Sequence, residues 1–241
     1  MAQGSTETSA RTRLAFIDNL RWTVIVMVVL THACVTYSGV GSWYYVEKAT
    51  VSPVQYLVFL FYQSFAQAFF MGILFFSAAL FVPGAYDRRG FGRFLRDRLI
   101  RLGVPTLVYM LVLDPLTSYI LAQGTGHPFP PGSGLHLWLQ YVGSGSFIGS
   151  SGPLWFALAL LIFSAVYALA RLVRDALAGG RPPAVRTLPA PRTLSAGAVC
   201  LMAVMAAGTF LVRIVQPIGT SVLNMQLCYF TQYVLLFCVG L

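Results

Sequence analysis

The apolar residues of this 241-residue chain are gathered into six long blocks, and this arrangement limits its fold more than any motif does. Hydrophobic residues make up 57% of the chain and charged residues 10%, whereas a soluble domain carries roughly a quarter charged residues. The blocks lie at about residues 22–40, 56–82, 102–121, 154–173, 196–215 and from 222 onward. Because a helix needs about 20 apolar residues to cross a bilayer, we expect an all-α polytopic bundle of about six transmembrane helices.

The spacing of the blocks predicts one transmembrane domain over residues 22–241, preceded by a cytoplasmic segment at residues 1–21. The second block is longer than a bilayer requires, so it should tilt or kink. Residues 122–153 are rich in Gly, Ser and Pro and should form an irregular or re-entrant outer segment, whereas residues 178–194 should form a flexible cytoplasmic linker. The chain stops inside an apolar run, so we expect a fragment with further spans beyond residue 241.

The charge distribution predicts an orientation. Sixteen Lys and Arg residues stand against seven Asp and Glu residues, for a net charge of +9. Nearly all the basic residues lie in three stretches between apolar blocks, residues 11–21, 88–101 and 171–192. This is the asymmetry that places basic loops in the cytoplasm, so it indicates a bilayer rather than a nucleic acid as the partner. We expect a multi-pass protein of the inner membrane with its N-terminus in the cytoplasm.

The first apolar block contains the most informative polar residues. Arg21 and His32 are eleven residues apart, which is about three helical turns and roughly 16 Å, so both should lie on one helix face. Asp18 lies one turn before Arg21 and can pair with it. His32 should lie near the middle of the bilayer, where its imidazole could remove a proton from a hydroxyl or carry an acyl group. A histidine that only joins packed helices by a hydrogen bond is the alternative.

The basic stretch before the third block is the second candidate site. Arg98 and Arg101 should be neighbours on one helical face, with Arg93 one to two turns earlier. Guanidinium groups bind phosphates in pairs, so this cluster suits a polyphosphate ligand such as coenzyme A. A membrane anchor that contacts anionic lipid is the alternative. Further along, Asp114 should lie in the outer half of the membrane and act as a relay or pair with His32 or Arg213.

The four cysteines indicate neither a disulfide framework nor a metal centre. They lie within or at the edge of apolar blocks, and their spacing matches no metal-ligand pattern. We therefore predict that they pack in helices and that the protein carries no metal.

Four segments of the sequence together resemble the acyltransferase 3 family. RLAFIDNLRWTVIVMVVLTHA contains an arginine, ten residues and then a histidine, the spacing typical of that family's first span. FFMGILFFSAALFVP is similar to its Phe-rich segment, although Ala78 follows Ser77 where relatives usually have glycine. FGRFLRDRLIRLGVP resembles its basic stretch, and GPLWFALALLIFS resembles the later Leu-Trp-Phe segment of the branch related to glucan biosynthesis protein C. Members of the family have about ten spans of membrane-crossing length.

This resemblance implies a membrane-bound acyltransferase that moves an acetyl or succinyl group from acyl-CoA to a hydroxyl of a carbohydrate or related acceptor at the outer face. It implies catalytic roles for His32 and Arg21 and binding of the donor by Arg93, Arg98 and Arg101. The residues alone leave two other classes open. A proton-coupled transporter or flippase could use His32, Asp114 and Arg213 as a relay, and a membrane scaffold would need none of them.

Overall fold

The computed structural model describes residues 4–41, 43–47, 50–124, 129–177 and 191–241, with side chains from residue 15 of the first helix and residue 195 of the ninth. Regular secondary structure in these residues is helical, and one isolated bridge joins Val222 to Met225. The chain divides into two compact units, residues 1–80 with 236–241, and residues 81–235.

Five helical stretches of the described residues are long and apolar enough to cross a membrane, which confirms the all-α polytopic class. They are Ala15–Ser38, Pro53–Ala79, Val82–Gly124, Gly152–Leu177 and Ser195–Val215, and a shorter apolar helix covers Leu227–Gly240. The sixth predicted span begins later than residue 222. Residues 222–226 form a tight turn in which Leu223 and Asn224 have positive φ angles of 52° and 61°, and a helix cannot contain such a turn.

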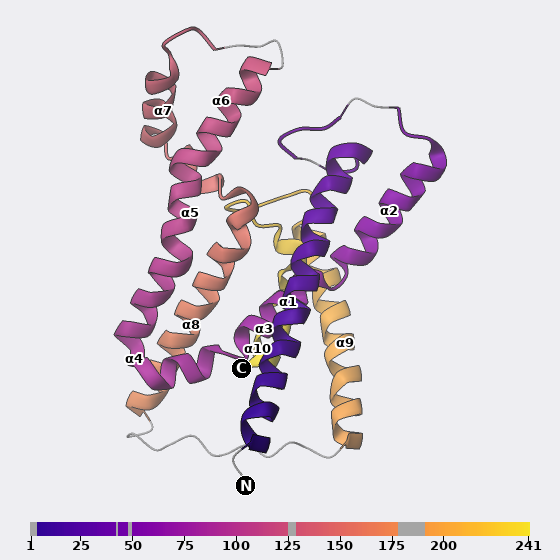
Figure 1. The fold of residues 1–241 in the computed structure, drawn as a ribbon, viewed down its shortest axis with the longest axis vertical. Helices are drawn as coiled ribbons and strands as arrows, with labels where there is room; N and C mark the ends of the chain where they lie inside the picture. Colours follow the sequence, from indigo (N-terminus) through magenta and orange to yellow (C-terminus); the bar gives the residue numbers. More distant parts are fainter. Residues whose placement is uncertain (1–3, 42, 48–49, 125–128, 178–190) are drawn as a thin grey trace. The chain divides into compact units, whose positions relative to one another are not determined.

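The first unit contains α1 (Gly4–Ser38), α2 (Pro53–Gln67) and α3 (Phe70–Ala79), seen in Figure 1 in indigo and violet. A capping box between Ser52 and Gln55, with Pro53 in the first turn, begins α2. The break between α2 and α3 falls at Phe69, whose φ of −143° is not helical. The predicted kink in the second span is thus confirmed as a break between two helices.

A single helical run of 43 residues begins the second unit. It comprises α4 (Val82–Arg98), α5 (Val104–Val108) and α6 (Asp114–Gly124), joined by π-helical turns at Leu99–Gly103 and Tyr109–Leu113. Gly90, with a φ of 70°, kinks the run inside α4, and Figure 1 shows the bend. The third predicted span, residues 102–121, lies within this run, and the basic stretch before it is also helical and continues into it.

Two prolines account for the two π turns in this run. Pro105 and Pro115 each stand two residues beyond a π turn and lack a backbone N–H to donate within the helix. In the second turn the Asp114 N–H bonds to the Tyr109 carbonyl, so the Met110 carbonyl loses its helical donor. In a regular helix the Leu111 carbonyl would accept a hydrogen bond from the backbone N–H of residue 115, but Pro115 has no N–H. Two consecutive carbonyls on one side of the helix are therefore left for other donors.

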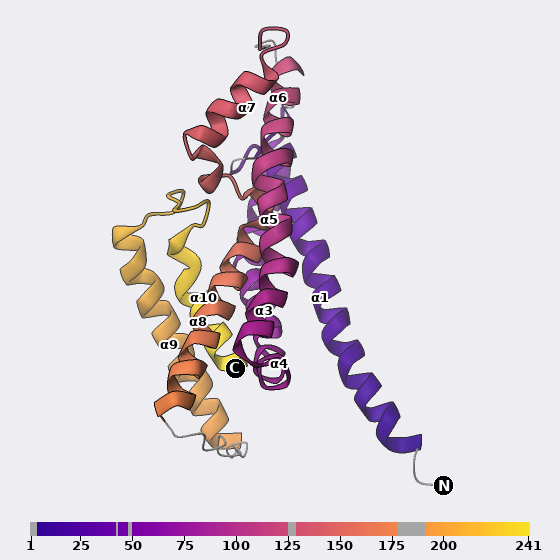
Figure 2. The same cartoon turned by 90° about the vertical axis from the view of Figure 1, so that its left-hand side faces the viewer.

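Side chains from α7 (Gly134–Gly143) supply those donors. The Tyr141 hydroxyl donates to the Met110 carbonyl at 2.7 Å, and Trp138 Nε1 donates to the Leu111 carbonyl at 2.7 Å. Figures 1 and 2 both show α7 alongside α6. Residues 122–153 were predicted to be irregular or re-entrant. The irregular alternative was wrong over α7, where Leu135, Trp138, Leu139 and Val142 recur at helical spacing, and the re-entrant alternative stays a prediction.

The remaining helices of the second unit are α8 (Trp155–Leu177) and α9 (Pro191–Val215), followed by α10 (Phe230–Gly240), whose last residues belong to the first unit. Trp155 of α8 packs against Phe230 and Tyr233 of α10, with ring centroids 6.3 and 5.9 Å apart. Just before α8, the Asn224 amide donates to the Gly152 carbonyl at 3.0 Å. These contacts join the start of α8 to the turn that precedes α10.

One arginine links α4 to α8. The guanidinium of Arg171 donates to Tyr167 Oη at 2.8 Å and to Asp87 Oδ1 at 2.7 Å, and it lies 5.1 Å from the ring centre of Tyr86. Its side chain is 14% exposed, which is low for an arginine. A planar, multidentate cation is needed to make all three contacts at once.

We expect Arg171→Lys to destabilise the protein by about 1–2 kcal/mol, because a lysine keeps the charge but not the forked geometry. Thermal unfolding in detergent measures the change. Arg174→Lys is the matched control, since the Arg174 side chain is 47% exposed and pairs with the adjacent Asp175. It should change stability by less than about 0.5 kcal/mol. Equal effects of the two substitutions would contradict a role for Arg171 in joining the helices.

Candidate functional site

Arg21 of α1 is bound to α3 through Ser77. Its Nη2 donates to the Ser77 carbonyl at 2.9 Å, and its Nε lies 3.4 Å from Ser77 Oγ. Ser77 is 1% exposed, so this contact is inside the first unit. Sequence reasoning did not assign Ser77 a role, although it lies in the Phe-rich segment that resembles the family. The Asp18 side chain is exposed, and its pairing with Arg21 stays a prediction.

His32 lies on the same unbroken helix, as predicted, and its ring stacks on Trp43. The ring centroids are 4.0 Å apart and the planes are inclined by 24°. Trp43 comes from the segment after α1, so this segment folds back over the helix end, and the Glu47 N–H donates to the Thr36 carbonyl at 2.8 Å. His32 lies six residues, about 9 Å, before the end of α1 and about as far beyond the midpoint of the stretch Ala15–Ser38, and its depth in the bilayer stays a prediction.

Polar side chains of α2 hold α1 on either side of His32. The Tyr62 hydroxyl donates to the Met27 carbonyl at 3.0 Å, and Gln63 Nε2 donates to Ser38 Oγ at 3.1 Å. The histidine is thus carried on a stretch of helix that is tied at both ends and covered by one aromatic ring. A half-buried imidazole held in this way is suited to exchange a proton with a bound hydroxyl.

The predicted donor-binding arginines lie at the junction of α4 and the first π turn, in the second unit. Arg98 is half-buried, and its guanidinium lies 5.3 Å from the ring centre of Phe94, which is 1% exposed. Arg98 is also close enough to Arg89 and Arg101 for their positive charges to interact with its own. Arg93 and Arg101 are exposed. Arg101 lies in the π turn, and its placement on one helical face with Arg98 stays a prediction.

Asp114 lies at the start of α6, where Tyr141 Oη is 3.3 Å from its Oδ2. Burial raises the pKa of the Tyr141 hydroxyl, and the charge of Asp114 raises it further, so the hydroxyl stays protonated and donates to α6 at neutral pH. Arg213 lies over the ring of Tyr229 at 5.5 Å. The predicted pairing of Asp114 with His32 or Arg213 stays a prediction.

Comparison with protein families accounts for nearly the whole chain. A family model of the acyltransferase domain matches residues 14–241, which include every candidate site residue named above. The chain belongs to the acyltransferase 3 family. It is therefore a multi-pass membrane acyltransferase, an enzyme that moves an acyl group other than an aminoacyl group. Comparisons with curated proteins and with solved structures returned no match.

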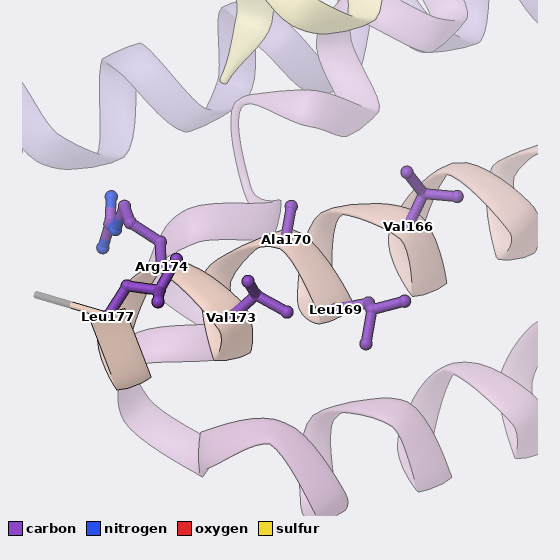
Figure 3. Close-up of a pocket in the computed structure, with 6 residues that line it drawn as sticks. All are labelled: Val166, Leu169, Ala170, Val173, Arg174 and Leu177. Carbon is purple, nitrogen blue, oxygen red and sulfur yellow. The ribbon is translucent and has the colours of Figure 1, made fainter.

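The acyltransferase also has an open groove of about 680 Å³ along one side of α8. Figure 3 shows the residues that line it, all of them from α8: Val166, Leu169, Ala170, Val173, Arg174 and Leu177. Five of the six are apolar and one helix supplies them all, so the groove is one face of a transmembrane helix. We assign it to contact with lipid or with another apolar helix rather than to catalysis.

Proposed function

We propose that this membrane acyltransferase takes an acetyl or succinyl group from acyl-CoA and transfers it to a hydroxyl of a carbohydrate or related acceptor at the outer face of the inner membrane. The observation that carries the choice of donor is the group of arginines around Arg98. The orientation with the N-terminus in the cytoplasm rests on the three basic stretches of the sequence.

The surroundings of Arg98 favour a phosphate ligand. Positive charges that lie near one another repel, and a bound anion relieves that repulsion. The ring of Phe94 lies against Arg98 and restricts its guanidinium, while the N–H groups at the edge of the guanidinium can still bind phosphate oxygens in pairs. Arg93 and Arg101 are exposed on the same helical run and can add further contacts. A coenzyme A ester carries several phosphate groups and suits such a cluster.

We assign the chemistry to His32. Its imidazole accepts the proton of the acceptor hydroxyl while the hydroxyl oxygen attacks the thioester carbonyl. The carbon–sulfur bond then breaks, an ester forms, and the departing thiolate of coenzyme A takes up the proton. In a two-step version the imidazole nitrogen first receives the acyl group and then passes it to the hydroxyl. Arg21 supports either version by holding α1 against α3 through Ser77.

The donor site is tested by removing two of its charges. In the protein purified into nanodiscs, Arg98→Ala combined with Arg101→Ala should raise the KM for acetyl-CoA at least about tenfold, because each lost charge-assisted hydrogen bond is worth about 1.5–3 kcal/mol. Release of coenzyme A in the presence of the acceptor measures the rate. The turnover number should change much less, since neither residue contacts the acceptor in this proposal.

Arg96→Ala combined with Arg174→Ala is the matched control, because it also removes two arginine charges, from exposed positions outside the proposed donor site. The KM of this control for acetyl-CoA should stay within about twofold of the wild-type value, as expected for exposed charges. An equal rise in KM for both double variants would show that only the overall charge matters. Absence of coenzyme A release from both acetyl-CoA and succinyl-CoA would overturn the choice of donor.

A further inference from the structure

A cavity of about 600 Å³ lies between α6 and α7, within the second unit and apart from the donor site proposed above. Its walls come from the second π turn, α6, α7 and the residues just before α7. Its lining side chains include Asp114, Tyr119, Phe129, Trp138 and Tyr141. The volume is that of a site for a small organic molecule.

The hydrogen bonds described above hold this cavity in shape. Trp138 and Tyr141 line it and are the two side chains that donate to the carbonyls left by Pro115. The rings of Tyr119 and Phe129, which also line the cavity, stack with centroids 5.7 Å apart and planes inclined by 8°. The aromatic walls are therefore built into the fold, and a ligand would not have to order them.

The chemistry of the walls selects for a positive charge. Four aromatic rings and one carboxylate line the cavity, and none of its described lining residues is Lys, Arg or His. The faces of aromatic rings attract cations, and several rings around one carboxylate are typical of sites for organic ammonium groups. Tyr141 Oη lies 3.3 Å from Asp114 Oδ2 and shares its single hydrogen with the Met110 carbonyl. A carboxylate has about four acceptor positions, so Asp114 can also face a ligand. An anionic ligand would be repelled by the faces of the aromatic rings and by the carboxylate of Asp114.

We infer that the cavity between α6 and α7 binds an organic ammonium ion, with its positive charge toward Asp114 and its apolar body against Tyr119, Phe129 and Trp138. This site goes beyond the proposed acyl transfer and does not depend on it. Ligands of this class carry a quaternary or protonated amine on a ring or a short apolar body. A neutral apolar molecule of the same shape fills the same space but gains nothing from the carboxylate.

The test uses two probes of the same shape that differ in charge, phenyltrimethylammonium and tert-butylbenzene. Isothermal titration into the full chain in nanodiscs, corrected for empty nanodiscs, gives both affinities. The cation should bind at least about tenfold more tightly than the neutral probe, the ratio that corresponds to about 1.4 kcal/mol. In Asp114→Asn this ratio should fall below about threefold, with the neutral probe unchanged. Asp175→Asn on α8 is the control and should keep the wild-type ratio.

A second variant keeps the inference testable if Asp114→Asn does not fold. Tyr119→Leu leaves an apolar side chain of similar reach but removes one aromatic face, so it should weaken the cation several-fold and the neutral probe little. Equal affinity for the two probes in the wild-type protein would overturn the inference, and so would a charge preference that both variants leave intact. Binding of the neutral probe alone would identify a purely apolar cavity.

Discussion

His32→Gln is expected to lower the turnover number for acyl transfer at least about a hundredfold, the low end of what a general base contributes. Glutamine is close to histidine in size and remains polar, so the packing against Trp43 is largely kept while the proton acceptor is lost. Release of coenzyme A from the donor, with the acceptor present, gives the rate. The KM for the donor should change little, because the proposed phosphate contacts are made by arginines of the other unit.

His136→Gln provides the control for this result. His136 is an exposed residue of α7, so its replacement should leave the rate unchanged. A His32→Gln enzyme with normal turnover would remove His32 from the mechanism. Acid quenching of the wild-type enzyme during turnover, followed by mass spectrometry, separates the two chemical versions. An acyl group on the peptide that contains His32 indicates the two-step route, and its absence with fast turnover indicates a general base.

Gly152→Ala is expected to destabilise the protein by about 2–5 kcal/mol. Gly152 has a φ of +48°, which costs an L-residue roughly 1–2 kcal/mol. A methyl group there would also lie 2.4 Å from Tyr109 Cε1, and displacing a packed ring costs about another 1–3 kcal/mol. The site is a junction, because Asn224 donates to the Gly152 carbonyl and Tyr109 begins the second π turn. Thermal unfolding in detergent measures the loss.

Two other glycines separate these two costs. A methyl group at Gly132 would meet no atom within 4 Å, but its φ is +77°, so Gly132→Ala should show the backbone cost alone, about 1 kcal/mol. Gly149→Ala would meet no atom within 4 Å either, and it should change stability by less than about 0.5 kcal/mol. If Gly152→Ala were no worse than Gly132→Ala, the contact with Tyr109 would make no contribution.

Errors in the sequence-based prediction arose where local composition conflicted with periodicity. Gly, Ser and Pro in residues 122–153 indicated an irregular segment, and they outweighed the helical spacing of Leu135, Trp138, Leu139 and Val142. The start of the last helix was placed at the first apolar residue of the block. The turn at Leu223 and Asn224 has positive φ angles but contains no glycine, the residue that usually indicates such a turn in a sequence.

The sequence by itself determined the class, the family and the positions of most membrane-crossing helices. It could do so because the length and hydropathy of a span are local properties, since each helix bonds its own backbone. It also placed Arg21 and His32 on one face, which needs only the helical repeat.

Only the tertiary structure decided which groups meet. Pro115 is visible in the sequence. The side chains that donate hydrogen bonds to the Met110 and Leu111 carbonyls, Tyr141 and Trp138, lie more than 20 residues away. The same holds for Arg21 with Ser77, His32 with Trp43 and Arg171 with Asp87. A polar group buried in a membrane protein must find a partner, and its identity depends on which helices pack together, a property that no single segment contains.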